Sequence, residues 1–156
     1  MAKSTFSGPV VSNNGFITAG SDSVVNITAE TTLTFNSHAG RIIEINDADG
    51  AVTLPSIATA EIGAVYRFFI GTTASDLDIK TDGTDKFVGS VSVGINNSTH
   101  KRFVPGATND VISMNGTTTG GIANSYVEIT ALATAEYMVQ GQLIGSGTIA
   151  TPFADS

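Results

Sequence analysis

The sequence predicts an all-β protein, an antiparallel β-sandwich or a jelly-roll-like single domain. Most apolar segments alternate with polar residues at a period of two, the spacing of a strand with one buried face. Threonine and other β-branched residues recur throughout the 156 residues, and 17 glycines allow sharp corners. Turn residues separate strand-length runs about every 8–12 residues, as in sandwiches and barrels.

The first half of the chain contains short alternating runs. The candidate strands there are marked by Val25 and Ile27, Leu33 and Phe35, Ile43 and Ile45, and Val52 and Leu54. Residues 65–70 are apolar at both parities apart from Arg67, so we expect this strand to be covered on both faces. The run Ile57–Gly63, after Pro55-Ser56, is the one candidate for a helical turn or two.

The second half repeats the alternation over longer runs. Leu77 and Ile79 alternate with acidic and basic residues, and residues 87–95 form a strand in which Gly89 and Gly94 are candidate bulge sites. Residues 126–131 and 137–144 form the last pair of strands. Residues 115–125 have the composition of a flexible loop, and the tail after residue 144 is expected to be extended.

Inward positions of these runs predict the core. The side chains expected to be buried are Val25, Ile27, Ile43, Ile45, Val52, Leu54, Phe68, Ile79, Val91, Val93, Val127, Ile129, Val139 and Leu143. We find no internal repeat and no boundary between domains.

The first residues differ from the rest. Residues 1–14 lack sustained alternation and contain Gly8-Pro9, which disfavours a central strand, so we expect an extended N-terminal arm before a sandwich domain at 15–156. Phe6, Pro9, Val10 and Val11 are the candidate anchors of this arm on another chain. The alternative is a frayed terminus without a role. The N-terminus has no apolar core of a secretory signal, so we expect synthesis in a cytoplasm.

Charge and cysteine content exclude several classes of function. The net charge of −7 argues against nucleic-acid binding, which needs clustered lysine and arginine. The densest basic spot is His100-Lys101-Arg102; its two cations are either solvated loop residues or contacts for an acidic partner surface. The absence of cysteine excludes disulfides and cysteine-ligated zinc.

The segment Asp47-Ala48-Asp49-Gly50 resembles the start of a calcium-binding loop. An EF-hand loop needs oxygen ligands at positions 1 and 12 as well. Aligning Gly50 with position 6 places Ile45 at position 1 and Ser56 at position 12, and neither can serve. We therefore expect a bend, with Asp-Gly forming a hairpin turn between two strands.

A second acidic cluster contains Asp76, Asp78, Asp82 and Asp85. A loop that gathered these carboxylates would hold a calcium ion. The alternation with Leu77 and Ile79 instead predicts that Asp76 and Asp78 form the solvent face of a strand, followed by a turn at Asp82-Gly83. We expect no metal and no cofactor.

Catalytic signatures are lacking. His38 and His100 are the only histidines, both lie in polar connectors, and no serine occupies a nucleophile elbow. Two of the 14 acids could converge as in a glycosidase, but the chain has no tryptophan to stack on a sugar. The expectation is a protein that is not an enzyme, with a glycan-binding or hydrolytic domain as the remote alternative.

Two stretches resemble small structural proteins of tailed phages. They are "LPSIATAEIGAVYRFFIGTT" at 54–73 and "DIKTDGTDKFVGSV" at 78–91, and the ends "STFSGPVVSNNGF" and "YMVQGQLIGSGTIATPF" are also similar to those of virion proteins. The resemblance covers most of the chain from Gly40 onward. Its motifs are structural rather than catalytic.

The resemblance implies a capsid decoration (cement) protein bound to the major capsid protein on the outer surface of the shell, commonly as a homotrimer. A subunit or host-recognition module of a phage fibre or spike is the competing expectation. No catalytic or metal-binding residue carries over. The N-terminal anchors Phe6, Pro9, Val10 and Val11, together with Lys101 and Arg102, are the expected contacts to the partner.

Overall fold

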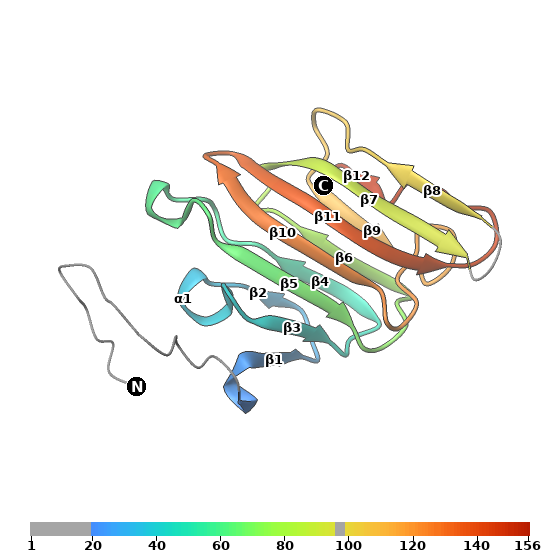
Figure 1. Cartoon of the computed structure of the whole chain (residues 1–156), viewed down its shortest axis with the longest axis horizontal. Helices are drawn as coiled ribbons and strands as arrows, with labels where there is room; N and C mark the ends of the chain where they lie inside the picture. The colour runs from blue at the N-terminus through green and yellow to red at the C-terminus, as the bar shows by residue number, and fades with distance from the viewer. Residues whose placement is uncertain (1–19, 96–98) are drawn as a thin grey trace, which may run out of the picture.

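Two mixed β-sheets packed face to face form the protein (Figure 1). The computed structural model describes residues 20–95 and 99–156, without the side chain of Ala60. Sheet A has the strand order β1-β3-β5-β10-β11-β7-β8, and sheet B has the order β12-β9-β6-β4-β2. The strands are β1 (Val24–Ile27), β2 (Thr31–Thr32), β3 (Ile42–Ile45), β4 (Asp49–Thr53), β5 (Val65–Ile70), β6 (Asp76–Lys80), β7 (Lys86–Ile95), β8 (His100–Phe103), β9 (Val111–Met114), β10 (Tyr126–Ala133), β11 (Glu136–Gly145) and β12 (Phe153–Ala154).

The prediction of an all-β, sandwich-like domain is confirmed, but the strands are not all antiparallel. Five of the ten strand pairs are parallel. From β1 to β6 the chain alternates between the sheets, so that β1, β3 and β5 are parallel in sheet A and β2, β4 and β6 are parallel in sheet B. Period-two alternation is identical for both directions of pairing, so it could not distinguish them.

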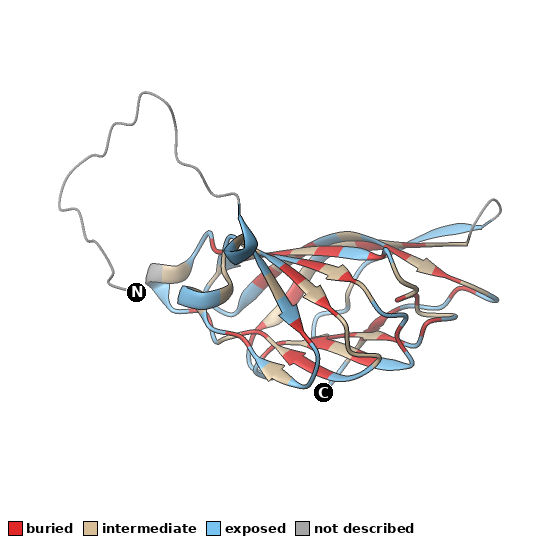
Figure 2. Cartoon of the chain, turned by 90° about the horizontal axis from the view of Figure 1, so that it is seen from below, coloured by how far each residue is buried: buried red, intermediate tan, exposed pale blue. Residues whose placement is uncertain are grey.

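The core lies between the sheets, as the buried residues of Figure 2 show. Every side chain predicted to be buried is buried except Val25, which is half-buried and packs against the core. Tyr66 and Tyr137 meet edge to face with ring centroids 6.4 Å apart. The Tyr137 hydroxyl donates a hydrogen bond of 2.6 Å to the Pro55 carbonyl, which satisfies its polar end. Burial raises the pKa of Tyr66 to about 12 and raises that of Tyr137 as well.

Some local predictions were right and others wrong. Thr59–Glu61 forms a 3₁₀ turn inside the expected helical segment, and the tail ends in β12, paired with β9. Phe35, however, begins the one-turn helix α1 (Phe35–His38) rather than a strand. The remaining short helix is the 3₁₀ turn η1 (Ser21–Ser23).

Glycines serve a different purpose from the predicted bulges. β7 pairs with β11 in unbroken register from Lys86 to Ile95, and the register shift lies in β10 between Ala131 and Ala133. Gly89 has a φ of 101°, and a Cβ there would collide with the Val139 carbonyl oxygen of β11. Glycine is thus required for a left-handed conformation in close contact with the neighbouring strand.

The loop at 115–125 is hydrogen-bonded and packed. The Asn115 Oδ1 atom accepts hydrogen bonds from the backbone N–H groups of Thr117 and Thr119, at 2.9 and 3.1 Å. Ser125 at its end is fully buried and receives a hydrogen bond from the Ile144 N–H. The polar composition therefore supplies internal partners for the loop.

The predicted arm at 1–14 lies outside the described residues, as do its anchors Phe6, Pro9, Val10 and Val11. The described part of the 15–156 domain begins at Gly20. None of the helices in the described part of the chain has the length and apolar character of a membrane-spanning segment.

Candidate functional site

The outer side of sheet A is the principal candidate for a functional surface, and we call it the open face. It consists of the outward side chains of β1, β3, β5, β10, β11, β7 and β8. Strand register aligns one row across the whole sheet: Asn26, Glu44, Phe69, Tyr126, Gln142, Ser92 and Arg102. In Figure 1 sheet A faces the viewer, and no described strand or helix lies in front of β5, β10 and β11.

Exposed apolar side chains gather on the open face. Among the described residues six large hydrophobic side chains are exposed, and four of them project from β1, β3 and β10 on this face. These are Val24, Ile42, Tyr126 and Leu132, with exposed fractions of 44%, 46%, 52% and 48%. Isolated exposed apolar residues are ordinary, but a concentration of this kind on one sheet marks a contact surface.

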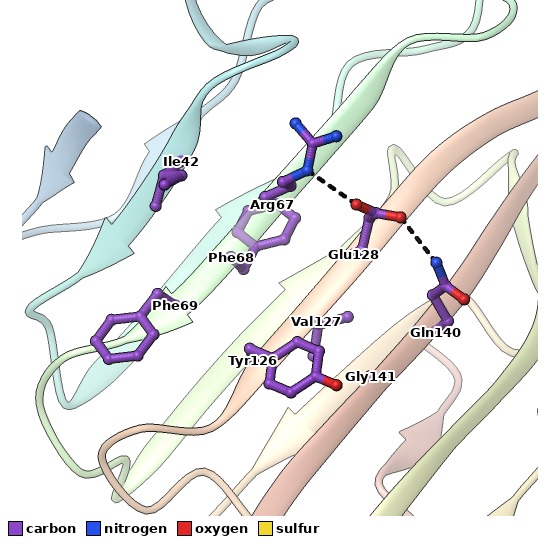
Figure 3. A pocket seen from close by; sticks show the side chains of 9 residues that line it. All are labelled: Ile42, Arg67, Phe68, Phe69, Tyr126, Val127, Glu128, Gln140 and Gly141. Atoms are coloured by element: carbon purple, nitrogen blue, oxygen red, sulfur yellow. Dashed lines mark hydrogen bonds and ion pairs between the residues drawn. The ribbon is translucent and has the colours of Figure 1, made fainter. Parts of the chain in front are cut away.

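A shallow pocket of about 480 Å³ lies at the centre of this face, between β3 and β11 (Figure 3). Its apolar wall consists of Ile42, Phe69 and Tyr126, and its polar wall of Arg67, Glu128 and Gln140. The sequence predicted that β5 is covered on both faces, and this is wrong. Phe69 is only half-buried, so β5 is covered on one face. The apolar residues at both parities of β5 therefore indicated a surface rather than a second covered side.

A short polar network joins three neighbouring strands beside the pocket. The Arg67 Nε atom donates to Glu128 Oε2 at 2.9 Å, and the Gln140 Nε2 atom donates to Glu128 Oε1 at 2.8 Å. In Figure 3 the two Nη atoms of Arg67 point away from Glu128, and the Arg67 side chain is half exposed. The network neutralises both charges and leaves guanidinium donors at the rim of an apolar pocket, where a polar partner group can reach them.

The predicted basic pair divides between two sides. Lys101 and Arg102 lie on β8 rather than in a loop, and successive residues of a strand point to opposite faces. Arg102 is on the open face, where its Nε atom donates to Ser90 Oγ at 2.7 Å. Lys101 points to the other side, with Nζ 3.4 Å from the Ile149 carbonyl oxygen. Only Arg102 can therefore contribute to the open face.

The predicted hairpin turn at Asp49-Gly50 is wrong: the chain changes direction at Asp47-Ala48, and Asp49-Gly50 already begins β4. The bend joins β3 of sheet A to β4 of sheet B, so it carries the chain from one layer to the other. The Asp49 N–H donates to Asp47 Oδ1 at 3.4 Å within the bend. Strands on both sides replace the helices of an EF-hand.

The second acidic cluster splits into outward and buried residues. Asp76 and Asp78 project from the outer side of β6, as predicted, while Leu77 and Ile79 are buried. Asp85 is also buried and accepts a hydrogen bond of 3.1 Å from the Ile57 N–H. Within the described ranges no three His, Asp or Glu side chains are grouped so that they could hold a metal ion.

The fold shifts the pKa values of Asp82 and Asp85 in opposite directions. Burial tends to raise the pKa of Asp82, but hydrogen bonds from the Asp85 and Thr84 N–H groups outweigh it and lower the pKa. Burial raises the pKa of Asp85, and the hydrogen bond from the Ile57 N–H offsets this only in part. Asp82 thus forms the predicted turn, whereas Asp85 belongs to the interior.

Sequence reasoning missed a buried ionic contact at the other edge of the sandwich. Lys86 Nζ of β7 lies 3.0 Å from Asp110 Oδ2, and Asp110 also accepts hydrogen bonds from the Ser156 N–H and hydroxyl groups. Burial tends to raise the pKa of Asp110, but Lys86 and Ser156 outweigh it and lower the pKa. This contact ties sheet A to the tail, and no pattern in the sequence linked residues so far apart.

Each of the two histidines contacts residues that are near it in the sequence. The Thr34 N–H donates to His38 Nδ1 at 2.9 Å, so the imidazole of the last residue of α1 binds the backbone of its N-cap residue. His100 lies exposed on β8, where its ring covers Gly94. Neither geometry activates a nucleophile through a base and an orienting acid.

Comparisons with protein-family models, with curated proteins and with solved structures gave no match.

Proposed function

We propose that the protein is a non-enzymatic structural protein of a virion. In this proposal it is a capsid decoration protein that works as a homo-oligomer, with a trimer as the expected form, bound to the major capsid protein on the outer surface of a phage shell. The open face is the observation that carries the proposal. A sheet face that presents four exposed apolar side chains, two of which (Ile42 and Tyr126) line a shallow pocket, is suited to a protein partner.

The structural segments of the resemblance support this proposal. Residues 54–73 and 78–91 contain β5 and most of β6 and β7, so they supply a central part of both sheets. They also contribute Arg67 and Phe69 to the pocket. A decoration protein needs surface rather than a catalytic cavity, and several weak contacts made by one oligomer add up to stable attachment.

A subunit of a fibre or spike is the second candidate function. The observation that favours it is the winding of β1 to β6, which adds one parallel strand to each sheet in alternation. Stacking of such coils builds elongated solenoids. The two candidates differ in their partner, because a decoration protein binds shells and a host-recognition module binds cells.

Co-sedimentation with undecorated capsids and, separately, with host cells tests the proposal. The informative variant is Tyr126→Asp, which places a charge on the apolar wall of the pocket, and the matched control is Thr32→Asp on the exposed β2 of sheet B. We expect wild type and control to bind capsids alike, and Tyr126→Asp to bind more than tenfold more weakly, a loss of about 1.4 kcal/mol or more.

Three results would count against the proposal. Wild-type protein that sediments with cells and not with capsids would favour the fibre or spike function. Capsid binding that Tyr126→Asp leaves unchanged would remove the open face from the contact. Equal loss in the Thr32→Asp control would show a general effect of added negative charge.

A further inference from the structure

We propose that residues 1–19 of a neighbouring copy lie across the open face, so that an exchange of N-terminal segments assembles the chains. The inference deepens the proposed function and rests on it in one respect, which is that the working form is an oligomer. In this inference Phe6, Pro9, Val10 and Val11 contact a second copy of the chain before any contact with the shell. Capsid attachment then depends on the open face through assembly, because Tyr126→Asp disperses the oligomer whose combined contacts hold it on the shell.

The pocket on the open face sets the chemistry of its occupant. Ile42, Phe69 and Tyr126 offer an apolar wall, and the Arg67–Glu128 pair leaves no uncompensated charge beside it. The Arg67 side chain is half exposed, and its Nη groups point away from Glu128 (Figure 3). A fitting partner is therefore apolar at a few positions, otherwise polar and uncharged, and supplies oxygen acceptors for a guanidinium.

Residues 1–19 have this chemistry. Their sequence is "MAKSTFSGPVVSNNGFITA", in which Lys3 is the only charged side chain. The apolar side chains Phe6, Val10, Val11, Phe16 and Ile17 occur among serine, threonine and asparagine. Pro9 has no backbone N–H, so the segment suits docking through side chains better than the continuous addition of a strand.

The point of attachment places this segment beside the open face. The described chain begins at Gly20 and enters β1, the edge strand of sheet A, where Val24 already belongs to the face. Nineteen extended residues span up to ~65 Å. The distance from β1 to β10 is three strand spacings, or ~14 Å. The segment is thus long enough to leave its own domain at the edge and cross the face of another.

Exchange between copies covers the open face of every chain in the assembly. Each chain gives one segment and receives one, which is a head-to-tail contact that closes into a ring when the rotation permits. A closed trimer of this kind leaves no apolar pocket uncovered and no segment unused. An intramolecular cover would bury the same residues without assembling the chains.

Complementation between two full-length variants tests the exchange. One variant, Tyr126→Asp, has a damaged face and an intact segment; the other, Phe6→Ser/Phe16→Ser, has an intact face and a damaged segment. Measured by light scattering, we expect wild type and Thr32→Asp to exceed one chain mass of 16.0 kDa and each variant alone to fall to it. Mixing the two variants should restore a larger complex, because one intact face then meets one intact segment.

A second measurement identifies the contact directly. A photo-crosslinker in place of Phe16 should attach to the peptide that contains Tyr126, and the product should have the mass of two chains. Ile42→Asp serves as a second face variant, with circular dichroism and thermal melting as checks that every variant is folded.

Several outcomes would overturn the exchange. A monomeric wild type would exclude exchange between copies, and a crosslink within one chain would show an intramolecular cover. Assembly of the Phe6→Ser/Phe16→Ser variant at wild-type strength would show that faces meet faces, and mixtures without a complex would exclude complementarity. Capsid co-sedimentation is scored separately: an assembled protein that ignores capsids refutes the proposed function alone, and capsid binding without segment exchange refutes this inference alone.

Discussion

The outer sides of the two sheets differ in their exposed large apolar residues, although both sheets cover the same core. The open face of sheet A carries Val24, Ile42, Tyr126 and Leu132 as exposed apolar residues. On the outer side of sheet B, register brings Asp49 opposite Asp76 and Asp78 opposite Ser113. None of the exposed large hydrophobic residues in the described chain projects from sheet B.

This difference separates the requirements of folding from those of association. Folding requires apolar side chains on the inner side of each sheet and sets few demands on the outer side. Sheet B follows that minimal pattern, with acidic and hydroxyl residues on its outer side: Asp76 is exposed there, and Asp78 and Ser113 are half-buried. Sheet A departs from it, and an excess of exposed apolar surface that the fold does not need indicates a partner. The predictions below test whether the two sides really differ in this way.

The largest expected effect compares two adjacent residues of β5. Phe68 is buried between the sheets and Phe69 is half-buried on the open face. Phe68→Ala should lower the free energy of unfolding by about 3–5 kcal/mol, because it leaves a cavity in the core. Phe69→Ala should lower it by about 1 kcal/mol, because that side chain is only partly removed from water. Urea denaturation measures both, and equal losses would show that the open face is part of the folding core.

An intermediate effect is expected where Lys86 and Asp110 hold the edge of the sandwich together. The pKa of Asp110 is lowered in the fold, so its charged form stabilises the protein above the unfolded pKa of about 3.9, and this stability is lost as pH falls through the lowered value. Asp110→Asn should therefore lower the free energy of unfolding by about 1–2 kcal/mol at pH 7. The loss should shrink below about pH 4.

Asp85→Asn is the matched control for that variant. The pKa of Asp85 is raised by burial, so its charged form disfavours the fold at neutral pH, with the opposite sign. The amide oxygen of asparagine still accepts the hydrogen bond from the Ile57 N–H. We expect neutral or slightly higher stability at pH 7, and a loss as large as that of Asp110→Asn would contradict the assigned directions.

The smallest effect is expected on the outer side of sheet B. Asp76→Asn removes the repulsion between Asp49 and Asp76 and should raise stability by no more than about 0.5 kcal/mol, less at high salt. EDTA should leave the melting temperature of the wild type unchanged. A calcium ion at ~100 times its dissociation constant would add about 2.7 kcal/mol, so a large calcium-dependent shift would revive this acidic surface as a metal site.

Local patterns of the sequence determined the fold class, the positions of most strands and the inner side of each. Inward positions such as Ile43, Ile129 and Leu143 could be assigned because burial of a strand repeats every two residues, and neighbours in sequence report it. The same reasoning placed Asp76 and Asp78 outside. It also predicted a change of direction between β3 and β4, although this lies at Asp47-Ala48 and not at the Asp-Gly pair that suggested it.

Only the tertiary structure decided which strands pair and which side chains share a face. The sequence could not tell a hairpin from a passage between layers at Asp49-Gly50, and so it missed the parallel pairing of β3 with β5 and of β4 with β6. It treated Lys101 and Arg102 as one basic spot, although the strand β8 sends them to opposite sides. The pocket of the open face combines Ile42, Arg67 and Tyr126, which are far apart in the chain. Strand register brings them together, and register depends on hydrogen bonds between distant segments that no local pattern encodes.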